Sequence, residues 1–229
     1  MIADHTVKSY DQEIVHLTRK ILEMGGLVED QISRSIEALV ESNVDLAEQV
    51  VERDDAVDTL EEEIDQFAIR MLATRQPVAV DLRLIAMAMK ISNDLERIGD
   101  YAAKGIAARC HRLAKEPARV QTLHAIPRMG QLVQGMVKDA LDAYVQRDAD
   151  KAVTVWRRDD EIDLMYDGLV RELLTYMMED ARNISACIDL MFIAKNLERM
   201  GDHATNICEK IHYIEHGERI NRMPPPVAG

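Results

Sequence analysis

The segment that decides the fold is Leu95-Glu-Arg-Ile-Gly-Asp100, which returns with one change as Leu197-Glu-Arg-Met-Gly-Asp202. These two segments are 102 residues apart. Earlier in the chain a shift of 105 residues superimposes residues 53–55, Arg-Asp-Asp, on residues 158–160. The two shifts differ by three residues, and a difference of this size within a turn leaves the flanking helices intact. Two copies of this length are too few for a solenoid and have the size of ordinary domains, so we predict two homologous units in tandem.

The acidic residues of each unit are placed symmetrically about a turn. In the first unit two of them precede Pro77 by the same distances at which two others follow it. In an antiparallel helical hairpin, residues equidistant from the turn lie at the same height, so four carboxylates are predicted at one level. The first predicted cluster is Asp54, Asp58, Glu96 and Asp100. The second, centred between Asp180 and Ala181, is Asp159, Asp163, Glu198 and Asp202.

Composition and periodicity predict helices throughout. Hydrophobic residues make up 47% of the chain and aromatic residues 4%, with the strong helix formers prominent. The predicted helices are 8–41, 45–74, 79–114, 119–146, 149–179 and 182–217, and Pro127 leaves the start of the fourth open. Counting about 100° per residue places the acidic residues on one flank of each apolar seam. We therefore expect clusters along outer grooves and not buried pockets.

Charge and apolar content exclude several classes of protein. A net charge of −13 argues against binding to nucleic acid or to anionic lipid. No stretch approaches the about 20 apolar residues of a membrane span, and the N-terminus has no signal-peptide core. The three cysteines form no C-x-x-C pair, which suits reduced thiols. The sequence predicts a soluble, cytoplasmic protein.

Four carboxylates at one level repel one another and call for a cation. Oxygen ligands suit hard ions, so Fe³⁺, Mn²⁺, Mg²⁺ and Ca²⁺ are candidates, with Zn²⁺ as a further one. The alternative is an ordinary solvated acidic face that nearby arginines neutralise. Those arginines are Arg53, Arg97, Arg158 and Arg199.

The duplicated E-x-x-x-D segments, the paired acidic hairpins and the chain length resemble the PhoU family. This resemblance covers residues 5–217. It implies an all-α fold of two homologous antiparallel three-helix bundles in tandem, which we delimit as 1–115 and 116–217. The proline-rich end of the chain predicts a disordered tail at 218–229. It also implies a multinuclear metal cluster on each bundle, with iron first among the candidates, held by the eight acidic residues named above. One departure is that Lys104 stands where the second copy has Asn206, so the first cluster is expected to be the weaker site.

The resemblance implies regulation and not catalysis. PhoU-like proteins act between the high-affinity phosphate ABC transporter, through its ATPase subunit, and the sensor histidine kinase PhoR. They keep the phosphate-starvation response off in plentiful phosphate and restrain uptake. A homodimer is expected. The sequence itself offers neither a Gly-rich phosphate loop nor a Ser/His/Asp nucleophile set.

Two other functions compete with this interpretation. Glu13-Ile-Val-His16 and Glu209-Lys-Ile-His212 match the E-x-x-H element of di-iron carboxylate enzymes. A metal-buffering protein is the other alternative, and Cys208, His212 and His216 share a helix face that could hold a soft metal. Gly99 and Gly201 weaken a helix by about 1 kcal/mol each, which predicts close approach by a neighbouring helix or a ligand.

Overall fold

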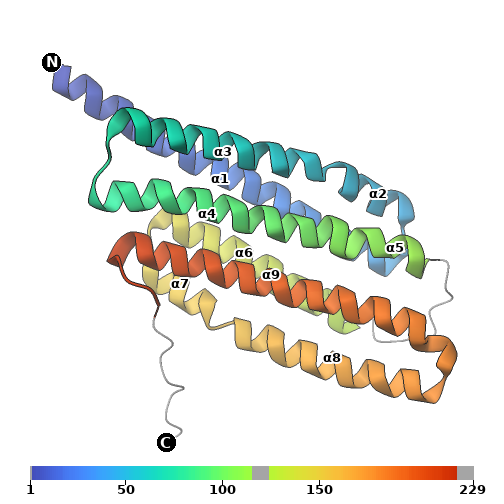
Figure 1. Ribbon diagram of the computed structural model, residues 1–229. Helices are drawn as coiled ribbons and strands as arrows, with labels where there is room; N and C mark the ends of the chain where they lie inside the picture. Colours follow the sequence, from blue (N-terminus) through green and yellow to red (C-terminus); the bar gives the residue numbers. More distant parts are fainter. Residues whose placement is uncertain (1, 115–123, 221–229) are drawn as a thin grey trace, which may run out of the picture.

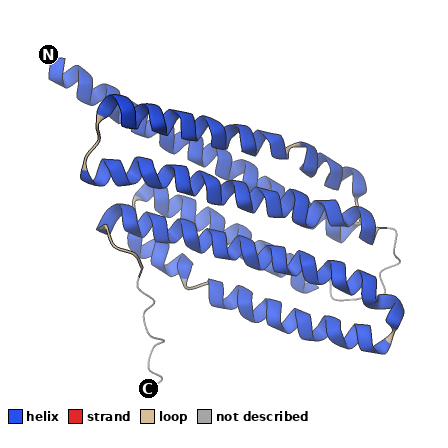
Figure 2. Ribbon diagram, viewed as in Figure 1, coloured by secondary structure: helices blue, strands red, loops and turns tan. Residues whose placement is uncertain are grey.

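The computed structural model describes residues 2–114 and 124–220. Within them the first unit comprises α1 (Ile2–Glu41), α2 (Val44–Glu52), α3 (Asp54–Arg75), α4 (Ala79–Asp100), the π-helical η1 (Tyr101–Ala107) and α5 (Ala108–Leu113). The second comprises α6 (Ala125–Gln146), α7 (Ala149–Trp156), α8 (Asp159–Glu179), the 3₁₀-helical η3 (Ala181–Asn183) and α9 (Ile184–His216). The described residues contain no strand (Figure 2), and the predicted all-α tandem fold is confirmed. The proposed boundary at 115/116 and residues 221–229 of the proposed tail lie outside the described residues.

Two of the predicted helices are each interrupted once. The helix predicted at 45–74 breaks at Arg53, and that predicted at 149–179 breaks at Arg157 and Arg158. The helices that follow start with acidic first turns, Asp54-Asp55 in α3 and Asp159-Asp160-Glu161 in α8. Carboxylates stabilise a helix N-terminus through the helix dipole, so these residues favour a new start over a continuation. The single-helix predictions were wrong here, although the acidic first turns carried the signal.

The remaining predicted helices differ from the observed ones at their ends. The helix predicted at 8–41 begins six residues earlier, at Ile2, and the helix predicted at 182–217 is Ile184–His216. The described part of the fourth helix begins at Ala125, with Pro127 in its first turn. Backbone N–H groups in a first turn have no partner within the helix, so proline loses no hydrogen bond there. The helix predicted at 79–114 runs through a π-helical stretch from Tyr101 to Ala107 before it ends. None of the helices in the ranges 2–114 and 124–220 combines the length and the apolar content of a membrane span.

The two units pack together through related surfaces. A Cβ on Gly25 would lie 2.2 Å from Leu141 Cδ1, and one on Gly130 would lie 2.8 Å from Ile36 Cγ1. The shift of 105 carries Gly25 onto Gly130 and Ile36 onto Leu141. These two contacts between α1 and α6 are therefore counterparts with the partners exchanged, as a pseudo-twofold axis requires.

The same axis passes between α4 and α9, which run side by side at the centre of the molecule (Figure 1). The rings of Tyr101 and His203 lie 5.7 Å apart, and the shift of 102 relates these two positions. Buried apolar residues from both units form one continuous core. The outer hairpins, α3 with α4 and α8 with α9, remain on opposite sides (Figure 1). Their helices contain the eight acidic residues.

Candidate functional site

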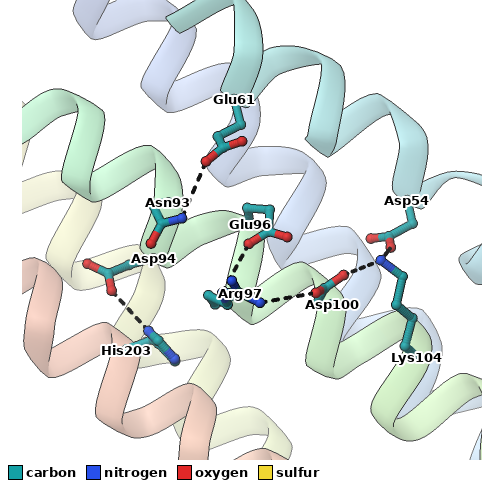
Figure 3. A network of polar contacts seen from close by, with 9 residues as sticks. All are labelled: Asp54, Glu61, Asn93, Asp94, Glu96, Arg97, Asp100, Lys104 and His203. Carbon is teal, nitrogen blue, oxygen red and sulfur yellow. Dashed lines mark hydrogen bonds and ion pairs between the residues drawn. The ribbon is translucent and has the colours of Figure 1, made fainter. Parts of the chain in front are cut away.

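The first acidic cluster lies where the start of α3 meets the end of α4. Asp54 is 3% exposed, and its Oδ1 accepts a hydrogen bond of 3.1 Å from Gln31 Nε2 on α1. Asp54 follows the buried Val50 by four residues and precedes the buried Val57 by three, so it continues the buried face of α2 and α3. The predicted outer-groove placement is wrong for this residue. Glu96 and Asp100 are partly buried on α4 (Figure 3).

The first cluster contains its own cations. Lys104 Nζ lies 3.0 Å from Asp54 Oδ2 and also donates to Asp100 Oδ1 (Figure 3). The hydrogen bonds to Asp100 and Asp54 raise the pKa of the Lys104 ammonium. Arg97 adds weaker contacts, at 3.5 Å to Glu96 Oε2 and 3.8 Å to Asp100 Oδ2. An ammonium group therefore occupies the space between α3 and α4 where the sequence predicted a metal ion.

The carboxylates of this cluster also influence one another across the hairpin. Burial, and then the charge of Asp54, raises the pKa of Asp58. Burial, and then the charge of Asp100, raises the pKa of Glu96, with a smaller contribution from Asp58. Asp58 Oδ1 and Glu96 Oε2 are buried without a hydrogen-bond partner. The mirror spacing thus brought the four residues together, as predicted.

The second cluster has less compensation. Burial, followed by the charges of Asp202, Asp163 and Glu198, raises the pKa of Asp159 to about 6. Burial and the same mutual repulsion also raise the pKa values of Asp163 and Asp202. Within the described ranges, Lys195 pairs with Glu198, but no side chain forms an ion pair with any of the three aspartates. All four predicted residues again lie together.

The repeat relationship explains this difference. The positions of Gln31 and Lys104, which donate to Asp54, correspond to Met136 and Asn206 in the second unit. A thioether has no N–H to donate and an amide carries no charge. The second cluster therefore lacks both the neutral donor and the cation that stabilise the first. Gln31 and Lys195 are the site residues that the sequence analysis missed, since neither shares a motif with the carboxylates.

The duplicated glycines let the helices approach closely. A Cβ on Gly201 would lie 2.7 Å from Ile162 Cδ1 and 3.2 Å from Asp159 Oδ1. A Cβ on Gly99 would lie 2.8 Å from Gln31 Oε1. Of the two expectations for these glycines, the approach of a neighbouring helix is the one found.

The other metal motifs of the sequence take part in ordinary contacts. Glu13 forms a salt bridge of 2.7 Å with Arg75, and the His16 ring packs at 4.9 Å against Phe67. In the second E-x-x-H element, Glu209 Oε1 accepts a 3.3 Å hydrogen bond from Trp156 Nε1. Cys208 is fully buried, and burial raises its thiol pKa to about 12.

A hard cation fits the second cluster better than the first. Throughout the ranges 2–114 and 124–220, no three Asp, Glu, His or Cys side chains converge closely enough to hold an ion as they stand. A bound ion therefore has to draw the carboxylates together. In the second cluster these are three aspartates without ion pairs to the described residues and Glu198, whose Oε1 pairs with Lys195 and whose buried Oε2 has no hydrogen-bond partner. In the first cluster an ion has to displace Lys104.

The raised pKa of Asp159 predicts a pH-dependent stability. The folded-state pKa of about 6 lies above the unfolded value of about 4, so the folded state binds more protons between these values. The metal-free protein should therefore become more stable as the pH falls from 7 to about 5. Asp159→Asn should stabilise the protein at pH 7 by about 1 kcal/mol and flatten this dependence. Urea denaturation at several pH values measures both, with Glu172→Gln on the exposed face of α8 as the control. A steeper pH dependence in Asp159→Asn would contradict the burial of this charge.

Comparison with known proteins agrees with this arrangement. The family model described as the PhoU domain matches residues 21–108 and 126–211, one match in each unit. The chain belongs to the PhoU family. Both PhoU matches contain a complete acidic hairpin, so the duplication visible in the sequence is the duplication of the family's domain.

Named relatives and solved structures extend over nearly the whole chain. The phosphate-specific transport system accessory protein PhoU homolog of Caulobacter vibrioides is 49% identical over 224 residues, which cover 98% of this chain and 97% of that protein. The homolog of Zymomonas mobilis is 48% identical and covers 94% and 90%. The crystal structure of PhoU from Pseudomonas aeruginosa has a TM-score of 0.88 at 42% identity and covers 91% of this chain and all of that chain. PhoU from Streptococcus pneumoniae has a TM-score of 0.86 at 32% identity and covers 93% and 99%.

Proposed function

We propose that this protein is a cytoplasmic negative regulator of the phosphate-starvation response. It couples the ATPase subunit of a phosphate ABC transporter to a PhoR-type sensor kinase and restrains phosphate uptake. The observation that carries the proposal is the near full-length similarity to proteins named as accessory to phosphate-specific transport. Both family domains and both acidic hairpins lie within the matched residues, so the similarity includes the candidate site.

The chemistry of the candidate site supports a regulatory role over a catalytic one. The conspicuous polar groups are carboxylates at helix flanks, and in the first unit they already pair with Lys104. The E-x-x-H residues that a di-iron enzyme would use make contacts with arginine, tryptophan and phenylalanine side chains. A helical protein of this kind acts through its surfaces.

We further propose that Asp159, Asp163, Glu198 and Asp202 hold a hard cation, with iron as the first candidate. Such an ion supplies positive charge at the level where the four carboxylates repel one another. The residues then contribute by fixing the start of α8 against α9, because α8 begins at Asp159 and Gly201 admits it closely. The metal would stiffen the outer hairpin of the second unit and change the charge of that hairpin's surface.

Signalling requires that this protein binds one transporter state more tightly than the other, because equal affinity for both shifts no equilibrium. The test deletes the gene and measures a starvation-induced phosphatase in phosphate-rich medium. We expect derepression that disappears when the kinase gene is also deleted, and that the wild-type gene on a plasmid reverses. Complementation with Asp163→Ala/Glu198→Ala then asks whether the second cluster is needed. Normal repression together with normal phosphate uptake in the deletion strain would refute the regulatory role.

A further inference from the structure

A cationic pocket lies at the junction of the two units, and none of its lining residues is one of the eight acidic residues described above. Its volume is about 410 Å³, and α4 and the C-terminal part of α9 form its walls. Three cations line it, Lys90, Lys210 and Arg219, together with the polar side chains of Asn206 and Tyr213. The acidic residue of the lining is Glu209, whose Oε1 accepts a hydrogen bond from the Trp156 indole N–H. In a chain with a net charge of −13 this concentration of cations is unusual.

Contacts within the protein hold Lys210 in place. Lys210 Nζ donates to the buried carboxylate of Asp94 and to the Asn206 carbonyl at 3.2 Å. An ammonium has three donors, so one N–H of Lys210 remains. In the part of the chain that the structure describes, neither Lys90 nor Arg219 forms an ion pair.

The turn that carries Arg219 is built against α4. Gly217 ends α9 with φ +73°, a left-handed conformation that suits glycine. Arg83 Nε donates to the Ile214 carbonyl at 3.0 Å, and His212 Nδ1 donates to the Glu218 carbonyl at 3.0 Å. Arg219 therefore extends from an anchored turn toward the pocket.

The internal repeat offers a comparison within the same molecule. The shift of 102 carries Met87 of the pocket onto Asp189. Asp189 accepts a hydrogen bond from Arg112 and lies 3.7 Å from Arg109 Nε. At the related place the protein's own carboxylate neutralises two arginines of α5, which are not the repeat counterparts of the pocket's cations. In the pocket a methionine replaces that carboxylate, and the positive charge faces solvent.

We propose that this pocket binds the phosphate group of a small anionic ligand. The two units together supply a guanidinium and two ammonium groups, with a phenol and an amide beside them. Phosphate oxygens accept hydrogen bonds from such donors. The volume admits inorganic phosphate or a phosphorylated metabolite. This site depends neither on the signalling role proposed above nor on a metal ion in the acidic clusters.

The test is calorimetric titration of the full-length, chelator-treated protein with inorganic phosphate and, separately, with ATP, at constant ionic strength. We expect binding of at least one of them, and a loss of affinity of about tenfold or more in Lys90→Ala/Arg219→Ala, because charge-assisted bonds carry the interaction. Lys138→Ala, which removes an exposed cation of α6, is the matched control and should leave the affinity unchanged. Circular dichroism verifies that the variants remain folded.

The outcomes separate the two sources of phosphate. Binding of phosphate alone identifies the free ion as the ligand, and binding of ATP alone identifies an organic phosphate. Either result supports the site if the double variant loses the binding. No binding of either ligand overturns the proposal. Equal affinity in the wild type and the double variant also overturns it, because the ligand then lies elsewhere. Neither result bears on whether the gene deletion derepresses the starvation response.

Discussion

Loading the metal-free protein with Mn²⁺ is expected to raise its melting temperature by about 5–10 °C. An ion present at about 100 times its dissociation constant stabilises the folded state by roughly 2.7 kcal/mol. In a chain of 229 residues, each kcal/mol shifts the midpoint by about 2–4 °C. Burial and then mutual repulsion raise the pKa values of Asp159, Asp163 and Asp202. The gain arises because the ion compensates the charge of these buried carboxylates and relieves their repulsion. Differential scanning calorimetry with elemental analysis measures the shift and the ion content.

Paired variants of the two units locate the effect. Asp163→Ala/Glu198→Ala should abolish most of the shift and lower the bound metal. The matched variant of the first unit, Asp58→Ala/Glu96→Ala, should retain most of it, because Lys104 already compensates that cluster. Equal metal content in the wild type and Asp163→Ala/Glu198→Ala would eliminate the second site. Equal losses in both double variants would show that Lys104 does not distinguish the clusters.

Replacing Asp94 by alanine is expected to lower the melting temperature by about 5–10 °C. Asp94 is 5% exposed and lies between the two units, where it accepts a hydrogen bond of 2.9 Å from His203 Nδ1 and another from Lys210. Figure 3 shows the first of these bonds, which crosses from α4 to α9. Removing one partner of a buried ionic group leaves the other unpaired, and we expect a cost of roughly 2–3 kcal/mol because Lys210 retains some access to water. Thermal denaturation without added metal measures it.

The repeat provides the control for this substitution. Asn196 occupies the position that corresponds to Asp94 under the shift of 102, so asparagine is compatible with this environment. Asp94→Asn keeps a hydrogen-bond acceptor and should cost less than Asp94→Ala. If both variants melt with the wild type, the contacts of Asp94 contribute nothing to the packing of α4 on α9.

Much of the candidate site was predictable because it depends on local spacing. Residues four apart on a helix lie on one face, and residues equidistant from a turn lie at one height, so spacing alone was sufficient to group the eight carboxylates. Burial and then the charge of Asp100 raise the pKa of Glu96. Both residues belong to the group that the spacing predicted. Gly99 and Gly201 likewise indicated close helix approach, because a glycine inside a helix costs stability unless a neighbour needs the space.

The helix interruptions were harder to predict from the sequence. Periodicity alone continues through Arg53 and Arg158, because the apolar positions on either side still fit a helical repeat. The acidic first turns of α3 and α8 compete with that continuation through the helix dipole. Asp54 lies four residues after the buried Val50 and three before the buried Val57, so it continues their buried face and meets Gln31. The outer-groove expectation failed for that residue for this reason.

The sequence by itself determined the all-helical class, the duplication and the two acidic groups, since these follow from periodicities within one helix or one hairpin. Only the tertiary structure decided which charges find partners. Asp94 meets His203 and Lys210 across more than a hundred residues, and Lys210 then reaches the pocket that Arg219 completes. These contacts depend on how α4 packs against α9. That packing is set by the shapes of many buried side chains together, and no local pattern in the chain encodes it.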